Sequence, residues 1–219
     1  CQDYQNGYYT AWEELTKRND IDVVVFLGDY IYEYAAIDQS DPRSTPPENE
    51  ILSLEDYRVR YNSYKIDPDL QYAHQQFPFI NIWDDHEVTN NSYKDGAENH
   101  DPATEGSYAD RVDVATQAFH EWLPIRTPNM ADRREIYRSF DFGDLLSLHM
   151  IEARLLERDE EGSDQAAYDD TTRRIIGDVQ FEWLKDELKS DTAKWRIIGN
   201  TVMFSYLSGD LPIIGNVTL

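Results

Sequence analysis

The chain has 219 residues, of which 40% are hydrophobic and 13% aromatic, so it can bury a core and is too aromatic to be intrinsically disordered. Its 43 acidic and 20 basic residues give a formal net charge of −23, which opposes binding to the phosphate backbone of a nucleic acid. The single cysteine excludes an intrachain disulfide framework, and the short apolar runs predict no transmembrane segment.

The first half of the chain is predicted to alternate helices with two strands. Apolar residues at helical spacing indicate a helix over residues 7–18. A run of β-branched residues then predicts a strand over 21–27 that is buried on both faces. Two helices are expected over 52–64 and 68–77, each opened by a residue type that caps helices. A second buried strand follows over 79–83.

The second half begins with a polar, turn-rich loop over residues 90–107 and an amphipathic helix over 108–123, which Pro124 ends. The remaining elements are expected in this order: a β-hairpin with strands over 136–141 and 145–151, a charged, mobile segment over 158–174, a helix over 177–188 and a strand over 195–199.

This order of elements predicts a layered α/β or α+β fold, formed by residues 1–219 as a single domain. No composition shift marks a linker, and no internal repeat is present. Ligands of open sheets gather beyond the carboxyl ends of the strands, so the residues that follow the two buried strands are the ones to examine for function.

Acidic side chains follow both of these strands. Asp29 comes after the first, and the run Asp84-Asp85-His86-Glu87 comes after the second. A lone acid at a strand end usually caps a turn, but adjacent carboxylates repel one another unless a cation lies between them. The cluster therefore predicts a metal site.

Two further side chains are candidate ligands of that site. Tyr32 lies three residues past Asp29, and a phenolate ligand would indicate a hard, highly charged ion such as Fe(III). Cys1 would add a thiolate if it lies at a neighbouring strand end. The alternatives are an aromatic core position for the tyrosine and a small buried apolar position for the cysteine.

Three segments together resemble the PhoD-type alkaline phosphatases (alkaline phosphatase D). They are residues 28–34 (Gly-Asp-Tyr-Ile-Tyr-Glu-Tyr), residues 82–87 (Ile-Trp-Asp-Asp-His-Glu) and residues 118–126 (Ala-Phe-His-Glu-Trp-Leu-Pro-Ile-Arg). The resemblance implies a calcineurin-like metallophosphatase domain with an αββα sandwich. It also implies a secreted enzyme, extracellular or periplasmic, that hydrolyses small phosphate monoesters or diesters with Fe(III) and Ca²⁺.

The resemblance also implies roles for individual residues. Asp29 is expected to bridge the metals, with Tyr32 and Cys1 on the iron. Asp85 stands where related enzymes have a ligand Asn, and His86 is expected to contact the phosphate or the leaving-group oxygen. A metal-activated hydroxide would attack phosphorus.

Four other residues complete the candidate site. Asn91 and Asp84 are expected at or near the metals. Arg58 and Arg126 are candidates to bind the substrate phosphate, although an arginine in either setting more often forms a structural ion pair. The other histidines are expected to be structural or exposed.

The sequence departs from the family pattern in two places. Residues 151–154 read Ile-Glu-Ala-Arg where family members read Leu-Asp-Thr-Arg, which moves a carboxylate outward by one methylene. The Gly-Asp-x-His segment with further metal ligands is not in the chain. With no Met before Cys1 and an apolar ending over 211–219, we expect a fragment truncated at both ends.

Three other functions are alternatives to metal-dependent hydrolysis. A serine hydrolase lacks its Gly-x-Ser-x-Gly elbow here, and no glycine-rich phosphate loop is present. A non-catalytic, acidic Ca²⁺-binding protein would explain the charge, but not an Asp-His pair after a buried strand. A truncated, inactive relative of the enzyme remains the third alternative.

Overall fold

The computed structural model describes residues 1–38, 40–129 and 131–203, and the apolar stretch 211–219 lies outside them. The elements in chain order are η1 (Tyr4–Asn6), α1 (Thr10–Thr16), β1 (Val24–Phe26), α2 (Leu54–Lys65), α3 (Pro68–Gln76), β2 (Phe79–Asn81), α4 (Pro102–Glu105), α5 (Tyr108–Trp122), β3 (Arg138–Phe142), β4 (Leu146–Met150), α6 (Gln165–Asp169), α7 (Gly177–Ser190) and β5 (Trp195–Gly199). The predicted mixture of helices and strands is confirmed.

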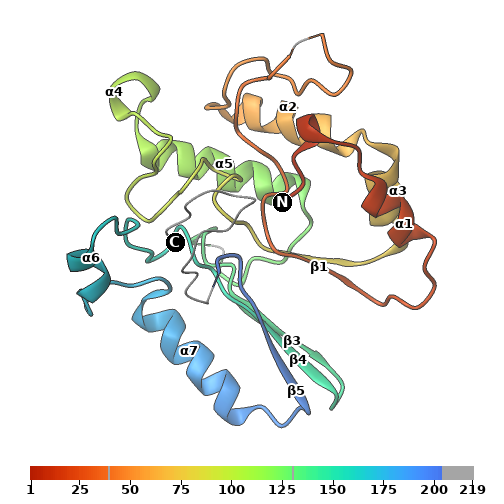
Figure 1. Ribbon diagram of the computed structural model, residues 1–219. Coiled ribbons are helices and arrows are strands. Elements are labelled where there is room, and N and C mark those ends of the chain that lie inside the picture. Colours follow the sequence, from red (N-terminus) through yellow and green to blue (C-terminus); the bar gives the residue numbers. More distant parts are fainter. Residues whose placement is uncertain (39, 130, 204–219) are drawn as a thin grey trace.

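The described strands form two sheets. β1 pairs in parallel with β2, and in the other sheet β4 pairs antiparallel with β3 and parallel with β5. Figure 1 shows α2 and α5 on the side of β1, and α7 alongside β3–β5 on the other side of the molecule. Because β1 and β2 run in the same direction, their carboxyl ends lie at the same sheet edge, as the sequence interpretation requires.

Aromatic side chains form much of the core between the helices and the first sheet. On α2, Tyr57, Tyr61 and Tyr64 recur at helical spacing and are fully buried. Trp83, just beyond β2, packs edge to face against Phe119 of α5 with ring centroids 5.0 Å apart. This packing holds the segment after β2 against a long helix, at the point where the acidic run begins.

Strands β1 and β2 are shorter than expected, and β1 is not buried on both faces. Val25 is 38% exposed and Leu27 is 43% exposed. Among the described residues β1 pairs with β2 alone, so part of this small sheet has no covering layer there. The apolar run correctly marks the strand, but burial depends on neighbours that the run itself does not specify.

Two predicted irregular segments contain short helices. Residues 90–107 include α4, and residues 158–174 include α6. An aspartate caps the N-terminus of each short helix, Asp101 for α4 and Asp164 for α6, and its side chain accepts a backbone N–H of the first turn. The predicted helices and the hairpin are all present with shifted ends, and the last strand has the predicted bounds. None of the helices in the described ranges has the length and hydropathy needed to cross a membrane.

Candidate metal centre

Two loops that follow β1 and β2 build the centre, and their close approach depends on Gly28. This residue has φ +98°, and a Cβ at its position would lie 2.3 Å from the backbone nitrogen of Asp84. Asp29 follows with φ +53°, in the left-handed region that few side chains adopt. Only glycine therefore lets the two loops touch at this point.

Substituting Gly28→Ala is expected to lower the free energy of unfolding by about 3 kcal/mol, because left-handed strain adds to a backbone clash. The measurement is urea denaturation. Gly106→Ala is the matched control, because Gly106 also has positive φ (+88°) but has open space where its Cβ would point. If Gly28→Ala and Gly106→Ala lower the free energy of unfolding equally, the close approach of the loops after β1 and β2 does not contribute to the effect.

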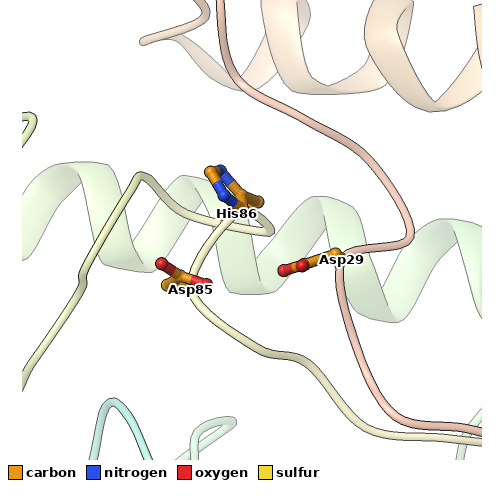
Figure 2. Close-up of side chains that lie close together, drawn as sticks. All are labelled: Asp29, Asp85 and His86. Atoms are coloured by element: carbon orange, nitrogen blue, oxygen red, sulfur yellow. The ribbon is translucent and has the colours of Figure 1, made fainter. Parts of the chain in front are cut away.

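Asp29, Asp85 and His86 come together at the carboxyl ends of β1 and β2. Each offers one ligand atom, and these atoms lie within 4.8 Å of one another. Figure 2 shows the Asp29 carboxylate pointing toward Asp85, with His86 beside them. Asp29 Oδ1 is buried and has no hydrogen-bond partner among the described residues. An unpartnered carboxylate oxygen beside a second carboxylate and an imidazole fits a bound cation.

Cys1 and Tyr32 lie against the same carboxylate. The Cys1 thiol donates to Asp29 Oδ2 at 3.0 Å, and its amino group donates to the carbonyl of Gly28 at 3.0 Å. The Tyr32 hydroxyl also donates to Asp29 Oδ2, at 3.2 Å. The structure thus gathers a thiol, a phenol, two carboxylates and an imidazole in one place.

Burial and neighbouring charges shift the pKa values of the acids in this cluster. Burial, reinforced by the charge of Asp85, raises the pKa of Asp29. Burial also raises the pKa of Asp84, to about 6. For Asp85 the effect of burial is overcome by the positive charges of Arg154 and His86, which lower its pKa.

His86 is oriented by a buried glutamate. Its Nδ1 lies 2.7 Å from Glu33 Oε2, which accepts the hydrogen bond, and its ring stacks on Tyr32 with centroids 4.2 Å apart. Burial opposes the charge on the imidazole, but Glu33, Asp85 and Asp29 together raise the pKa of His86 to about 9. Because Nδ1 is engaged by Glu33, Nε2 is the nitrogen available to a ligand.

Asp84 and Asn91 lie beside the cluster but have protein partners of their own. Arg154 Nε lies 2.5 Å from Asp84 Oδ1, and Arg154 Nη2 lies 3.5 Å from Asp85 Oδ1. The backbone N–H of Asn91 donates to Asp85 Oδ2 at 2.6 Å, while its side chain donates to Glu98 at 2.5 Å. Asn91 and Arg154 thereby hold the Asp85 carboxylate, and Arg154 links it to Asp84.

Comparison with known proteins assigns the chain to a family. The sequence pattern of the PhoD-like phosphatases matches residues 1–215. The chain belongs to the PhoD-like phosphatase family. Alkaline phosphatase D from Bacillus subtilis (strain 168) is 35% identical over 216 residues. The match covers 94% of this chain and 36% of that protein.

A solved structure described as "Structure of PhoD" has the same fold. It matches with a TM-score of 0.77 and 34% identity, over 90% of this chain and 39% of that one. This PhoD-like chain therefore spans less than half the length of both relatives. The predicted family and the metallophosphatase type of α/β fold are confirmed.

The two predicted phosphate-binding arginines lie in different settings. Arg58 of α2 donates through Nε and Nη2 to both carboxylate oxygens of Glu121 on α5, each at 2.7 Å. This ion pair is the structural alternative that the sequence left open. Arg126 is exposed in the segment after α5. A role in binding substrate stays a prediction for both.

Three residues of the PhoD-like centre were not assigned roles from the sequence. They are Glu33, Glu87 and Arg154. Glu33 holds His86, Glu87 joins the two loops, and Arg154 pairs with Asp84. Both glutamates lie inside the segments that carry the family resemblance, so their position was a usable signal. Arg154 is about 70 residues from its partner along the chain, and no local pattern links them.

Glu152, the residue that departs from the family pattern, has a structural role in this chain. Its Oε1 accepts from the indole N–H of Trp83 at 2.8 Å, and its carboxylate also accepts three backbone N–H groups of the turn over residues 154–156. It therefore fixes the turn that presents Arg154 to Asp84. The extra methylene of glutamate is accommodated within this network.

Proposed function

We propose that this chain carries part of the active site of a metal-dependent phosphatase that hydrolyses small phosphate esters, monoesters or diesters. The observation that carries the proposal is the buried, unpartnered oxygen of Asp29 beside Asp85 and His86. Membership of the PhoD-like family supports the same reaction. A bacterial alkaline phosphatase D among its relatives supports phosphatase activity, and the extracellular or periplasmic location is the expectation that goes with the family resemblance.

The donor set suits Fe(III) together with Ca²⁺. A phenolate oxygen favours a hard trivalent ion, and a thiolate favours a transition-metal ion. Carboxylate oxygens favour Ca²⁺. Asp29, Asp85, Tyr32 and Cys1 would hold these ions, and His86 lies beside them. When bound, such ions lower the pKa of an attacking water and neutralise charge on the phosphoryl group.

The residues around the ions have separate tasks. Glu33 accepts from His86 Nδ1 and so fixes the ring with Nε2 free, from which a proton would pass to the departing oxygen of the ester. Arg154 balances part of the charge of Asp84 and Asp85. Asp29 would offer Oδ1 to the cations, while its Oδ2 accepts from the thiol of Cys1 and the phenol of Tyr32, each of which would give up that proton on binding an ion.

Hydrolysis of p-nitrophenyl phosphate and bis(p-nitrophenyl) phosphate tests the proposal directly. The full-length protein containing this chain is assayed as purified, after chelation, and after Fe(III) and Ca²⁺ are restored. We expect activity that chelation removes and the ions restore. Calcium binding without turnover would favour an acidic calcium-binding protein, and neither binding nor turnover would favour an inactive relative.

Tyr32→Phe is expected to remove the visible absorption band that a phenolate gives when it binds Fe(III), because the substitution deletes the phenol oxygen. The measurement is an absorption spectrum of the iron-loaded protein. Tyr34→Phe is the control, since Tyr34 also contacts the His86 ring, edge on at 5.3 Å, but is 39% exposed. A band that survives in Tyr32→Phe and disappears in Tyr34→Phe would transfer the ligand role to Tyr34.

A further inference from the structure

Glu87 ties the loop after β1 to the loop after β2. Its side chain comes from the second loop and is 1% exposed. Its Oε2 accepts the backbone N–H of Asp29 at 3.1 Å, and its Oε1 accepts that of Tyr30 at 2.5 Å. The same Oε2 accepts the N–H of Asp84 at 2.8 Å. One buried carboxylate thus connects three backbone groups of the two loops.

Glu33 makes the opposite connection. It belongs to the first loop, is fully buried, and reaches residues of the second loop. Its Oε1 accepts the backbone N–H of Asn90 at 2.7 Å and the Thr89 hydroxyl at 3.3 Å, while Oε2 accepts from His86. Each loop therefore contributes one glutamate to the backbone of the other.

We propose that Glu33 and Glu87 form a reciprocal clasp that sets the separation of the Asp29 and Asp85 carboxylates for cation binding. Both are positioning residues in this proposal. It deepens the proposed function, because the site that the clasp holds is the one assigned to the catalytic ions.

The clasp opposes the repulsion between the carboxylates. Asp29 and Asp85 are both buried, and their like charges would push the loops apart wherever no cation lies between them. The bonds from Glu87 also hold the backbone on both sides of Asp29, whose φ is +53°. The separation is then fixed before a cation arrives, so binding need not order the loops.

The two glutamates differ from ligands in what their oxygens do. All four carboxylate oxygens of the pair accept hydrogen bonds from protein groups, whereas Asp29 Oδ1 has no partner among the described residues. Glu33 and Glu87 thus add rigidity around the site, and their oxygens are engaged by protein groups.

Isothermal titration of the full chain with Mn²⁺, comparing wild type with Glu87→Gln, tests the clasp. Glutamine keeps the length of the side chain, but its amide nitrogen cannot accept a backbone N–H, so either the bond from Tyr30 or the bonds from Asp29 and Asp84 are lost. Loss of a residue that orients ligands typically weakens metal binding by about 10–100-fold, and we expect a loss in that range. The double variant with Glu33→Gln should lose less than the product of the two single losses.

Asp67→Asn is the matched control for lost stability. Asp67 is a buried carboxylate that accepts two backbone N–H groups and the Arg43 guanidinium, and it caps α3 rather than joining the two loops. We expect it to lower the free energy of unfolding as Glu87→Gln does, but to leave Mn²⁺ affinity within about twofold, which is below the effect of an orienting residue. Equal Mn²⁺ affinity in Glu87→Gln and wild type would overturn the clasp.

Turnover separates this proposal from the proposed function. With p-nitrophenyl phosphate, we expect Glu87→Gln to lower kcat while KM changes little, because Glu87 is 1% exposed and its oxygens accept backbone N–H groups. If wild type binds Mn²⁺ and hydrolyses neither ester, the proposed function fails. A weakened Mn²⁺ affinity in Glu87→Gln would still uphold the clasp in that case.

Discussion

Asp29→Asn is expected to lower phosphate-ester hydrolysis by about three orders of magnitude or more. The substitution keeps the shape of the side chain but removes the negative charge of a carboxylate whose Oδ1 has no hydrogen-bond partner in the described part of the chain. Losing about 4 kcal/mol of charge stabilisation by bound ions corresponds to roughly a 10³-fold loss of rate. The measurement is kcat/KM for p-nitrophenyl phosphate with saturating ions.

The same substitution is expected to stabilise the metal-free protein by about 1 kcal/mol, a gain typical of relieving a functional site. Burial raises the pKa of Asp29, so its ionised form costs stability once the pH exceeds the unfolded pKa. In chelator, wild-type stability should therefore fall as pH rises from about 3.8 through the raised pKa, and this contribution to the fall should be missing in Asp29→Asn.

An exposed aspartate provides the control for both effects. Asp38 accepts from Ser40 at the surface, and Asp38→Asn should leave both turnover and metal-free stability essentially unchanged. Normal turnover in Asp29→Asn would remove Asp29 from the centre. Loss of turnover together with loss of stability would mean that Asp29 acts through the fold.

His86→Ala is expected to lower kcat by about 10²–10³-fold, within the range for a positioned proton donor. Glu33 holds the imidazole at 2.7 Å, so the ring is fixed before substrate binds. KM should change less than kcat, because the proton is transferred only as the ester bond breaks. The control is His120→Gln on α5, where the imidazole contacts the carbonyl of Arg133 and kcat should stay near wild type.

The ionisation of His86 provides a second measurement. Its pKa is raised to about 9 in the metal-free protein, so its pairing with Glu33 contributes stability in full below about pH 6.5, the unperturbed value. That contribution should be lost as pH rises through about 9. Unfolding free energies between pH 6 and pH 10 in chelator should show this fall in wild type and a smaller one in His86→Ala. Parallel pH profiles would contradict the ion pair.

The sequence predicted the meeting of Asp29 with Asp85 for a physical reason. Both follow a run of residues suited to a buried parallel strand, and parallel strands bring their carboxyl ends to one edge. The predictions of exposure were less successful. Val25 lies within such a run yet is 38% exposed, because burial depends on the layers that neighbouring elements supply.

The partners that hold the centre were harder to predict. Glu33 and Glu87 lie within the recognised segments, but the exchange of their side chains between loops depends on the turn at Gly28, which brings the loops into contact. Arg154 reaches Asp84 only because β4 and the turn held by Glu152 present it there. Such contacts arise from tertiary packing, which periodicity and local motifs do not encode.

The most direct test of the account is an anomalous difference map from crystals of the protein soaked in Mn²⁺. If a cation binds between the two carboxylates, we expect a strong peak about 2.0–2.6 Å from oxygens of both Asp29 and Asp85, with His86 and Tyr32 beside it. A map with no peak between these two carboxylates, in crystals where Mn²⁺ binds elsewhere on the acidic surface, would contradict it.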